Sequence, residues 1–200
     1  MFKFLGVLII MTMFNATVTV AETISLTRPD ITGETGTLMS ALANRQSIKD
    51  FADKELDSAE LGGLLWAAYG VNRPDGHRTI PTAMNEHDLD VYVFRHDGIW
   101  RYDADQHALT SVSHTDRRDL FRTQPYMTKA PVVLVYTGSA QDYAAMHAGS
   151  AYQNVGLYAA SRGLANVVRG YFDTNAIARV LNLDKNQRVI VSQAVGYPNP

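Results

Sequence analysis

Apolar residues recur at two spacings along this chain, and each spacing predicts a different kind of element. Spacing of three and four positions predicts helices at 37–45, 57–70, 140–162 and 174–183, with a shorter one at 116–124. Runs rich in β-branched and aromatic residues predict a hairpin at 89–105, a strand or extended loop at 165–173, and strands at 130–138 and 188–198. Strands separated by long helices, together with one hairpin, indicate an α+β fold with helices packed on a mixed β-sheet.

Local signals predict the ends of several of these elements. Asp57 stands three residues before Glu60, a spacing that resembles a capping box and favours a helix start. Gly163 is well placed to end the longest helix. The dipeptide Asp97-Gly98 favours a type I′ turn, so the hairpin is expected to turn there. The run 130–138 is continuously apolar, which is typical of a central strand buried on both faces.

The beginning of the chain is expected to lie outside the folded domain. Residues 1–21 carry one cation, an apolar run and a small-residue stretch, which is the order of a secretory signal peptide cleaved after Ala21. An uncleaved anchor is the alternative, although a membrane span needs about 20 apolar residues. Residues 22–36 are expected to form an extended N-terminal arm before a domain at 37–200. The protein would then be periplasmic or secreted.

The composition excludes several classes of protein. The chain has 200 residues and a net charge of −2, so it offers no basic surface for nucleic acid, and no membrane contact is expected beyond the signal peptide. It contains no cysteine, which excludes disulfides, thiolate metal ligands and cysteine nucleophiles. None of its histidines forms the i, i+4 pair of a helical metal site, so no metal is expected. The common nucleophile-elbow and phosphate-loop motifs are absent as well.

Arg45, Ser47 and Lys49 stand at alternate positions immediately after the first predicted helix. Arginine grips phosphate bidentately, a serine hydroxyl donates to another oxygen and lysine adds a point charge, so the three residues suit an anion. Charged residues at helix ends are usually solvated, and the pattern alone leaves both interpretations open.

A resemblance to a known family connects these three residues to four other segments. The stretch "RQSIKDF" (45–51) is similar to the opening pattern of the FMN-dependent nitroreductase family. "LLWAAYGVNRPDG" followed by "PTA" (81–83) resembles its SagB/ThcOx-type dehydrogenase branch. The hairpin "VYVFRHDGIWRYD", a helix at 147–163 and a terminal "VGYP" follow in the family's order. The resemblance implies a nitroreductase-like α+β fold with its flavin site at a homodimer interface.

The resemblance also implies roles for individual residues. Arg45 and Ser47 would bind the phosphate and ribityl end of FMN, and Lys49 would face the pyrimidine edge of its ring system. The backbone of Gly170 and Tyr171 would approach flavin N5, and no side chain is assigned as catalytic. The partner subunit would line the flavin with four residues, namely Pro81, Thr82, Ala83 and Asn85.

Three features depart from the family pattern. The chain ends at "VGYPNP", where many relatives continue to a Lys or Arg that completes the phosphate site, so Arg45 would carry most of that charge. A polar stretch at 84–88 replaces an apolar, aromatic-containing one, and His87 within it is either a proton donor to substrate or a surface histidine. The signal peptide would take the protein to a compartment where NAD(P)H is not expected.

The sequence therefore predicts an exported FMN-dependent oxidoreductase. It would transfer hydride through flavin N5 by a ping-pong mechanism, from a small-molecule donor to an electron-poor acceptor. The first alternative is a ligand-binding or interaction module that has lost tight FMN binding, which the polar stretch and the C-terminus favour. The second is a ThcOx-type enzyme that oxidises a peptide heterocycle, although this chain has no neighbouring peptide-recognition sequence.

Overall fold

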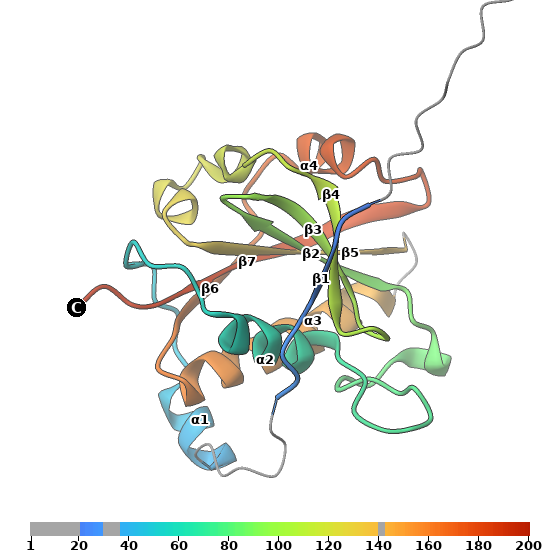
Figure 1. Ribbon diagram of the computed structural model, residues 1–200, viewed down its shortest axis with the longest axis horizontal. Coiled ribbons are helices and arrows are strands. Elements are labelled where there is room, and N and C mark those ends of the chain that lie inside the picture. The colour runs from blue at the N-terminus through green and yellow to red at the C-terminus, as the bar shows by residue number, and fades with distance from the viewer. Residues whose placement is uncertain (1–20, 30–36, 140–142) are drawn as a thin grey trace, which may run out of the picture.

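The structure, a computed structural model, describes residues 21–29, 37–139 and 143–200. Residues 1–20 of the predicted signal peptide and residues 30–36 of the predicted arm lie outside the described part. A seven-stranded sheet forms the centre, in the order β1-β4-β3-β2-β5-β7-β6 (Figure 1). Its strands are β1 (Thr23–Ser25), β2 (Leu89–Arg95), β3 (Gly98–Asp103), β4 (Ala108–Ser113), β5 (Val132–Ser139), β6 (Ala165–Arg169) and β7 (Gln187–Gly196).

The predicted α+β class is confirmed, with helices on both faces of the sheet (Figure 1). The helices are α1 (Leu38–Asn44), α2 (Ser58–Tyr69), α3 (Tyr143–Ser161) and α4 (Thr174–Val180), with 3₁₀ turns η1 (Ala83–Asn85), η2 (Arg118–Phe121) and η3 (Pro125–Thr128). Each of the six strand pairings is antiparallel, so the parallel pairs of a mixed sheet do not occur between the described strands. None of the helices in the described ranges is long and apolar enough to cross a membrane.

Apolar side chains form two cores, one on each face of the sheet. The first core lies under α2 and α3, and the second core lies under η2, η3 and α4. β5 contributes to both, because Leu134 and Tyr136 face the first core whereas Val133 and Val135 face the second. The expectation of a central strand buried on both faces is therefore confirmed.

The start of α2 combines a helix cap with an ion pair. The Asp57 Oδ1 accepts the Glu60 N–H at 2.8 Å, as the capping-box spacing predicts. The Glu60 carboxylate does not reach back to the cap. It accepts the Tyr158 hydroxyl at 3.1 Å and the Arg162 Nε at 2.9 Å, and so fastens α2 to the end of α3.

The hairpin turns one residue earlier than predicted. Arg95 pairs with Gly98, so His96 and Asp97 form the two-residue turn and Gly98 belongs to β3. Gly98 has φ 139°, and an added Cβ would lie 2.1 Å from the Ser113 carbonyl oxygen. Glycine is required at this position by the close approach of β4, a strand that the hydrophobic pattern did not reveal.

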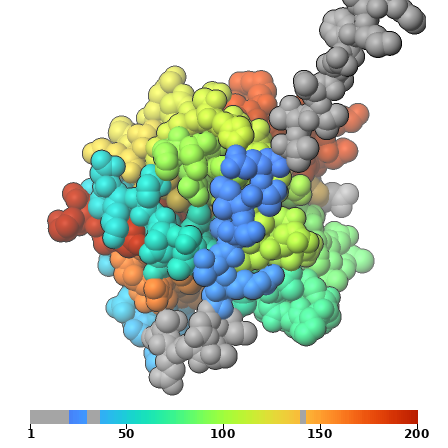
Figure 2. Space-filling view, viewed as in Figure 1, coloured from blue at the N-terminus to red at the C-terminus, as the bar shows by residue number. Residues whose placement is uncertain are grey.

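Residues 22–28 form an N-terminal strap that adds a strand to the sheet and then crosses α2. Ile24 pairs with Leu109 of β4, and the Leu26 N–H donates to the His107 carbonyl oxygen at 2.9 Å. An added Cβ at Gly62 of α2 would lie 2.2 Å from the Thr27 carbonyl oxygen, so the glycine allows this crossing. In Figure 2 the N-terminal strap is the blue band across the front of the molecule.

Candidate functional site

The segment that follows α1 lies along β6 and is fixed there by one backbone hydrogen bond and one from a side chain. The Ile48 N–H donates to the Asn166 carbonyl oxygen at 2.9 Å, and the Asn166 Nδ2 donates to the Gln46 carbonyl oxygen at 3.4 Å. Ile48 packs against the second core, whereas Ser47 and Lys49 on either side of it are exposed. Ile48 is therefore the position that faces the protein, and the hydroxyl and ammonium groups on either side of it face solvent.

Three cations lie along β6 without an acidic partner. Arg45 lays its side chain over Gly156 of α3, where an added Cβ would lie 3.6 Å from the Arg45 Cγ and Cδ. The Lys49 Nζ is 5.8 Å and the Arg169 Cζ 5.4 Å from the centre of the Tyr126 ring. Within the described ranges, no acid forms an ion pair with Arg45, Lys49 or Arg169.

Many arginines elsewhere in the described chain are neutralised. Eight of them form ion pairs with Asp or Glu, namely Arg73, Arg78, Arg95, Arg101, Arg117, Arg118, Arg122 and Arg162. Unpaired cations that share one region repel one another and raise its positive potential, which attracts anions. The region beside β6 is therefore suited to an anionic ligand.

Tyr126 connects this region to the segment of 3₁₀ turns. Its hydroxyl accepts a hydrogen bond from the Arg169 Nε and donates to the Gln124 Oε1 at 2.8 Å. Close by, the Thr123 hydroxyl donates to the Tyr171 carbonyl oxygen at 3.0 Å. These bonds hold the chain beyond β6 in place.

The backbone that follows β6 is open to a ligand. Gly170 is exposed, and an added Cβ would find no atom within 4 Å. Tyr171 is 72% exposed. Lys49 and Arg169 lie over the same Tyr126 ring, so the structure places the 45–49 segment beside the end of β6 from which Gly170 and Tyr171 follow.

The segment Pro81–Asn85 lies at the other end of α3. The Ala83 N–H donates to the His147 Nε2 at 2.8 Å, whereas Arg45 covers Gly156, nine residues further along the helix. At 1.5 Å per residue, these two points on α3 are about 14 Å apart. Within a single chain, the structure does not bring Pro81, Thr82, Ala83 and Asn85 to the region beside β6.

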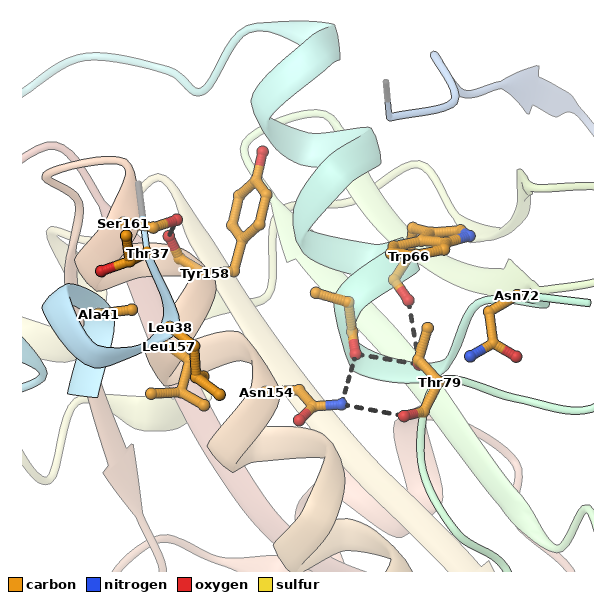
Figure 3. A pocket seen from close by; sticks show the side chains of 11 residues that line it. Thr37, Leu38, Ala41, Trp66, Asn72, Thr79, Asn154, Leu157, Tyr158 and Ser161 are labelled. Atoms are coloured by element: carbon orange, nitrogen blue, oxygen red, sulfur yellow. Dashed lines mark hydrogen bonds between the residues drawn. The ribbon is translucent and has the colours of Figure 1, made fainter. Parts of the chain in front are cut away.

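A cavity of about 400 Å³ opens between α1, α2 and α3 (Figure 3). Asn154 bridges two segments here, because its Nδ2 donates to the Ala67 carbonyl oxygen at 3.1 Å and to the Thr79 carbonyl oxygen at 3.4 Å. None of the predicted flavin-binding residues lines this cavity. Leu38, which does line it, is 65% exposed.

His87 lines a different cavity, one of about 410 Å³ that also contains Tyr69 and Arg78. Partial burial, and then the nearby Arg78, lower the pKa of His87. The lowered pKa favours the neutral imidazole, which is a much poorer proton donor than imidazolium. Its place in an exposed loop agrees with the surface-histidine interpretation.

Four residues of the region around the site were not found from the sequence. Asn166 is buried in β6, His147 accepts the Ala83 N–H, and Tyr126 lies under Lys49 and is bonded to Arg169, so each contact joins distant segments. A sequence signal was available for Asn166 alone. It is a polar residue inside the apolar run that forms β6, and buried polar groups require hydrogen-bond partners.

Comparison with known proteins decides the family. A model of the nitroreductase family matches residues 42–197. The chain belongs to the nitroreductase family. A protein of Methanocaldococcus jannaschii that is named as a nitroreductase is 30% identical over 184 residues, covering 81% of this chain and 91% of that protein. The matched range includes each predicted site residue of this nitroreductase-family chain.

Solved structures agree with this assignment. A protein of Ralstonia eutropha named as a nitroreductase is 34% identical and has a TM-score of 0.82, over 89% of this chain and 90% of that one. A chain of the Escherichia coli microcin synthetase complex is 23% identical with a TM-score of 0.66, over 88% of this chain and 78% of that one. This second likeness shows the fold alone.

Proposed function

We propose that this nitroreductase-family chain is an oxidoreductase that binds FMN beside β6. The observation that carries the proposal is the group of cations formed by Arg45, Lys49 and Arg169, which lack acidic partners in the described chain. A phosphate would supply the missing negative charge to Arg45, whose planar guanidinium matches two phosphate oxygens. The exposed Ser47 hydroxyl is free to donate to a further oxygen.

The remaining residues suit the ring system of a flavin. When bound, FMN would supply the redox chemistry, taking hydride at N5 from a donor and passing it to an electron-poor acceptor such as a nitroaromatic or a quinone. Lys49 would favour negative charge on the pyrimidine edge, and the open backbone of Gly170 and Tyr171 allows close approach to N5. The chain would contribute binding, orientation and electrostatics, and no protein nucleophile is needed.

A homodimer would complete each site. Pro81, Thr82, Ala83 and Asn85 lie too far along α3 to reach the Arg45 region of their own chain, so a second copy would deliver them. Large apolar side chains are exposed on three elements and would be buried by such a copy, namely Leu38, Met39 and Leu42 of α1, Met84 of η1, and Tyr143 and Met146 of α3.

Two further statements belong to this proposal. Residues 1–21 would direct export, so the enzyme would act in the periplasm or outside the cell and would take electrons from a donor other than cytoplasmic NAD(P)H. Membership of the SagB/ThcOx-type branch rests on the "LLWAAYGVNRPDG" stretch. The rival function, a ligand-binding module without tight FMN binding, is favoured by the exposed polar residues Asn85, Glu86 and His87.

The proposal predicts that Arg45→Ala weakens FMN binding about tenfold or more, because a charge-assisted hydrogen bond to the phosphate is lost. Flavin fluorescence quenching measures the dissociation constant, and gel filtration followed by absorption spectra measures retained flavin. Arg179→Ala is the matched control, since Arg179 is exposed on α4 and also lacks an ion pair in the described chain.

The two functions give opposite results in this experiment. FMN retained by the wild type and by the Arg179 variant, and lost by the Arg45 variant, supports the flavoenzyme. A well-folded wild-type protein that binds no flavin at any concentration tested would leave only the binding module.

A further inference from the structure

His147 is a buried histidine whose two ring nitrogens are both used. Its side chain is 4% exposed and lies on α3 against the start of β2. The Nε2 accepts the Ala83 N–H at 2.8 Å, and the Nδ1 lies 2.6 Å from the Asp88 Oδ1. An amide N–H needs a lone pair as its acceptor, so the ring proton is on Nδ1 and is donated to Asp88. Asp88 thereby selects the tautomer that can hold Ala83.

The segment that His147 holds is poorly supported in other ways. Met84 and Asn85 have φ of 53° and 58°, in the left-handed region that residues other than glycine rarely adopt. Met84 is 84% exposed, and the hydrogen bonds of Asn85 and Glu86 run back into the segment itself. Between residues 80 and 87, the bond from Ala83 is the one hydrogen bond to another element among the described residues.

We propose that His147, oriented by Asp88, is a positioning residue for the segment Pro81–Asn85. The inference rests on the proposed function, in which this segment lines the flavin of the partner subunit. An imidazole with one fixed tautomer holds the Ala83 amide at one place and keeps the strained pair Met84–Asn85 in its left-handed conformation. The segment that lines the flavin would then be preorganised before the flavin binds, which lowers the conformational entropy lost on binding.

Two amide substitutions separate positioning from ordinary packing. The side-chain oxygen of Gln reaches the place of the imidazole Nε2, whereas the Asn side chain reaches only the place of Nδ1. His147→Gln therefore keeps an acceptor for the Ala83 N–H. His147→Asn loses that acceptor and keeps only an amide N–H that can donate to the Asp88 carboxylate. Both replace a buried ring by a smaller amide at the same helical position, so both should lower the melting temperature to a similar extent.

The first measurement needs no flavin. Hydrogen exchange of the Ala83 amide, followed by NMR in the apo protein, should become about tenfold faster or more in the Asn variant, because its acceptor is lost. The Gln variant should stay close to the wild type. The second measurement is the FMN dissociation constant, which should rise about tenfold in the Asn variant and only slightly in the Gln variant.

The outcomes separate this inference from the function on which it rests. Equal FMN affinity in the two variants, or unchanged Ala83 exchange in the Asn variant, overturns the positioning role while the flavoenzyme stands. A wild type that binds no FMN overturns the proposed function, and with it the flavin-lining role. Faster Ala83 exchange and weaker FMN binding in the Asn variant alone support the inference.

Discussion

At the scale of single residues, a row of buried amides connects the centre of the sheet to the segment that carries Arg45. The Tyr136 hydroxyl donates to the Gln193 Oε1 at 2.8 Å, and the Gln193 Nε2 donates to the Asn166 Oδ1 at 3.2 Å. Asn166 in turn holds the carbonyl oxygen of Gln46. Because each member is buried and bonded, the network fixes the backbone of a surface segment from inside the molecule.

Asn166→Leu tests this network. Leucine is of similar size but leaves Gln193 and the Gln46 carbonyl oxygen without one partner each, so the free energy of unfolding should fall by about 1–3 kcal/mol. FMN binding should weaken as well, because the segment that carries Arg45 loses the hydrogen bond from Asn166 to the Gln46 carbonyl oxygen. Urea unfolding measures the stability, and Asn186→Leu in the exposed turn before β7 is the control, with an expected change within about 0.5 kcal/mol. Wild-type stability in the Asn166 variant would contradict the role of the network.

The sequence revealed those site residues that lie close together along the chain. Arg45, Ser47 and Lys49 share one short stretch, so their alternation is visible without a structure. Asn166 and Tyr126 act through contacts with segments that are 40 residues or more away in the sequence, as in the bonds to Gln46 and Arg169. Such contacts depend on sheet register and packing, and no local pattern encodes them.

At the scale of elements, His107 fastens the N-terminal strap to the sheet. Its Nδ1 accepts the Tyr102 hydroxyl at 2.8 Å, and its Nε2–H donates to the Thr27 carbonyl oxygen at 3.1 Å. Burial lowers the pKa of His107, partly offset by the bond to Thr27. The imidazole is therefore held in its neutral form. A protonated ring could no longer accept the Tyr102 hydroxyl and would be repelled by Arg28 of the N-terminal strap, so protonation would weaken the packing of the strap on the sheet.

The sign of the resulting pH effect follows from this lowered pKa. In the unfolded chain the imidazole takes up its proton near pH 6.5, at a higher pH than in the folded protein. The stability that the neutral ring contributes is thus complete above pH 6.5 and is lost as the pH falls toward the lowered folded pKa. The melting temperature should drop between pH 7.5 and pH 5.5, and less so in His107→Gln.

His96→Gln is the control for this experiment, because the His96 side chain is 54% exposed. It should keep the pH dependence of the wild type. An identical drop in the His107 and His96 variants would show that His107 does not couple the N-terminal strap to pH.

The sequence predicted an element correctly where the spacing of apolar residues within that element was sufficient to define it. The four main helices and the central strand lie where apolar spacing put them. The stretch 116–124 became the short 3₁₀ turn η2, because the Asp116 carboxylate accepts the Arg118 N–H and Pro125, which begins η3, cannot continue a helix. β4 was missed and the hairpin turn was one residue off, since both depend on pairing with a neighbouring strand.

At the scale of the whole molecule, the exposed apolar residues of α1 are the feature that suggests assembly. Met39 and Leu42 are 72% and 46% exposed, on a helix that packs beside α3. In the proposed homodimer, a second copy would cover this surface, and the Pro81–Asn85 segment of one chain would line the Arg45 region of the other. The flavin site and the quaternary structure would then depend on each other.

Leu42→Asp tests this dependence. A charge in a buried dimer interface would be desolvated, so sedimentation should show a shift from dimer to monomer, with a matching loss of retained FMN. Val112→Asp is the matched control, because Val112 is 40% exposed but lies on β4. A Leu42 variant that stays dimeric would place the interface elsewhere.

The N-terminal strap has one more consequence. β1 covers the outer edge of β4, whose residues 108–110 pair with it. Unpaired strand edges recruit other chains, and a strand of three residues offers a far poorer template than the six residues of β4. Release of the strap would expose the longer edge of β4 to other molecules. Protonation of His107, by weakening the packing of the strap, would thus favour self-association.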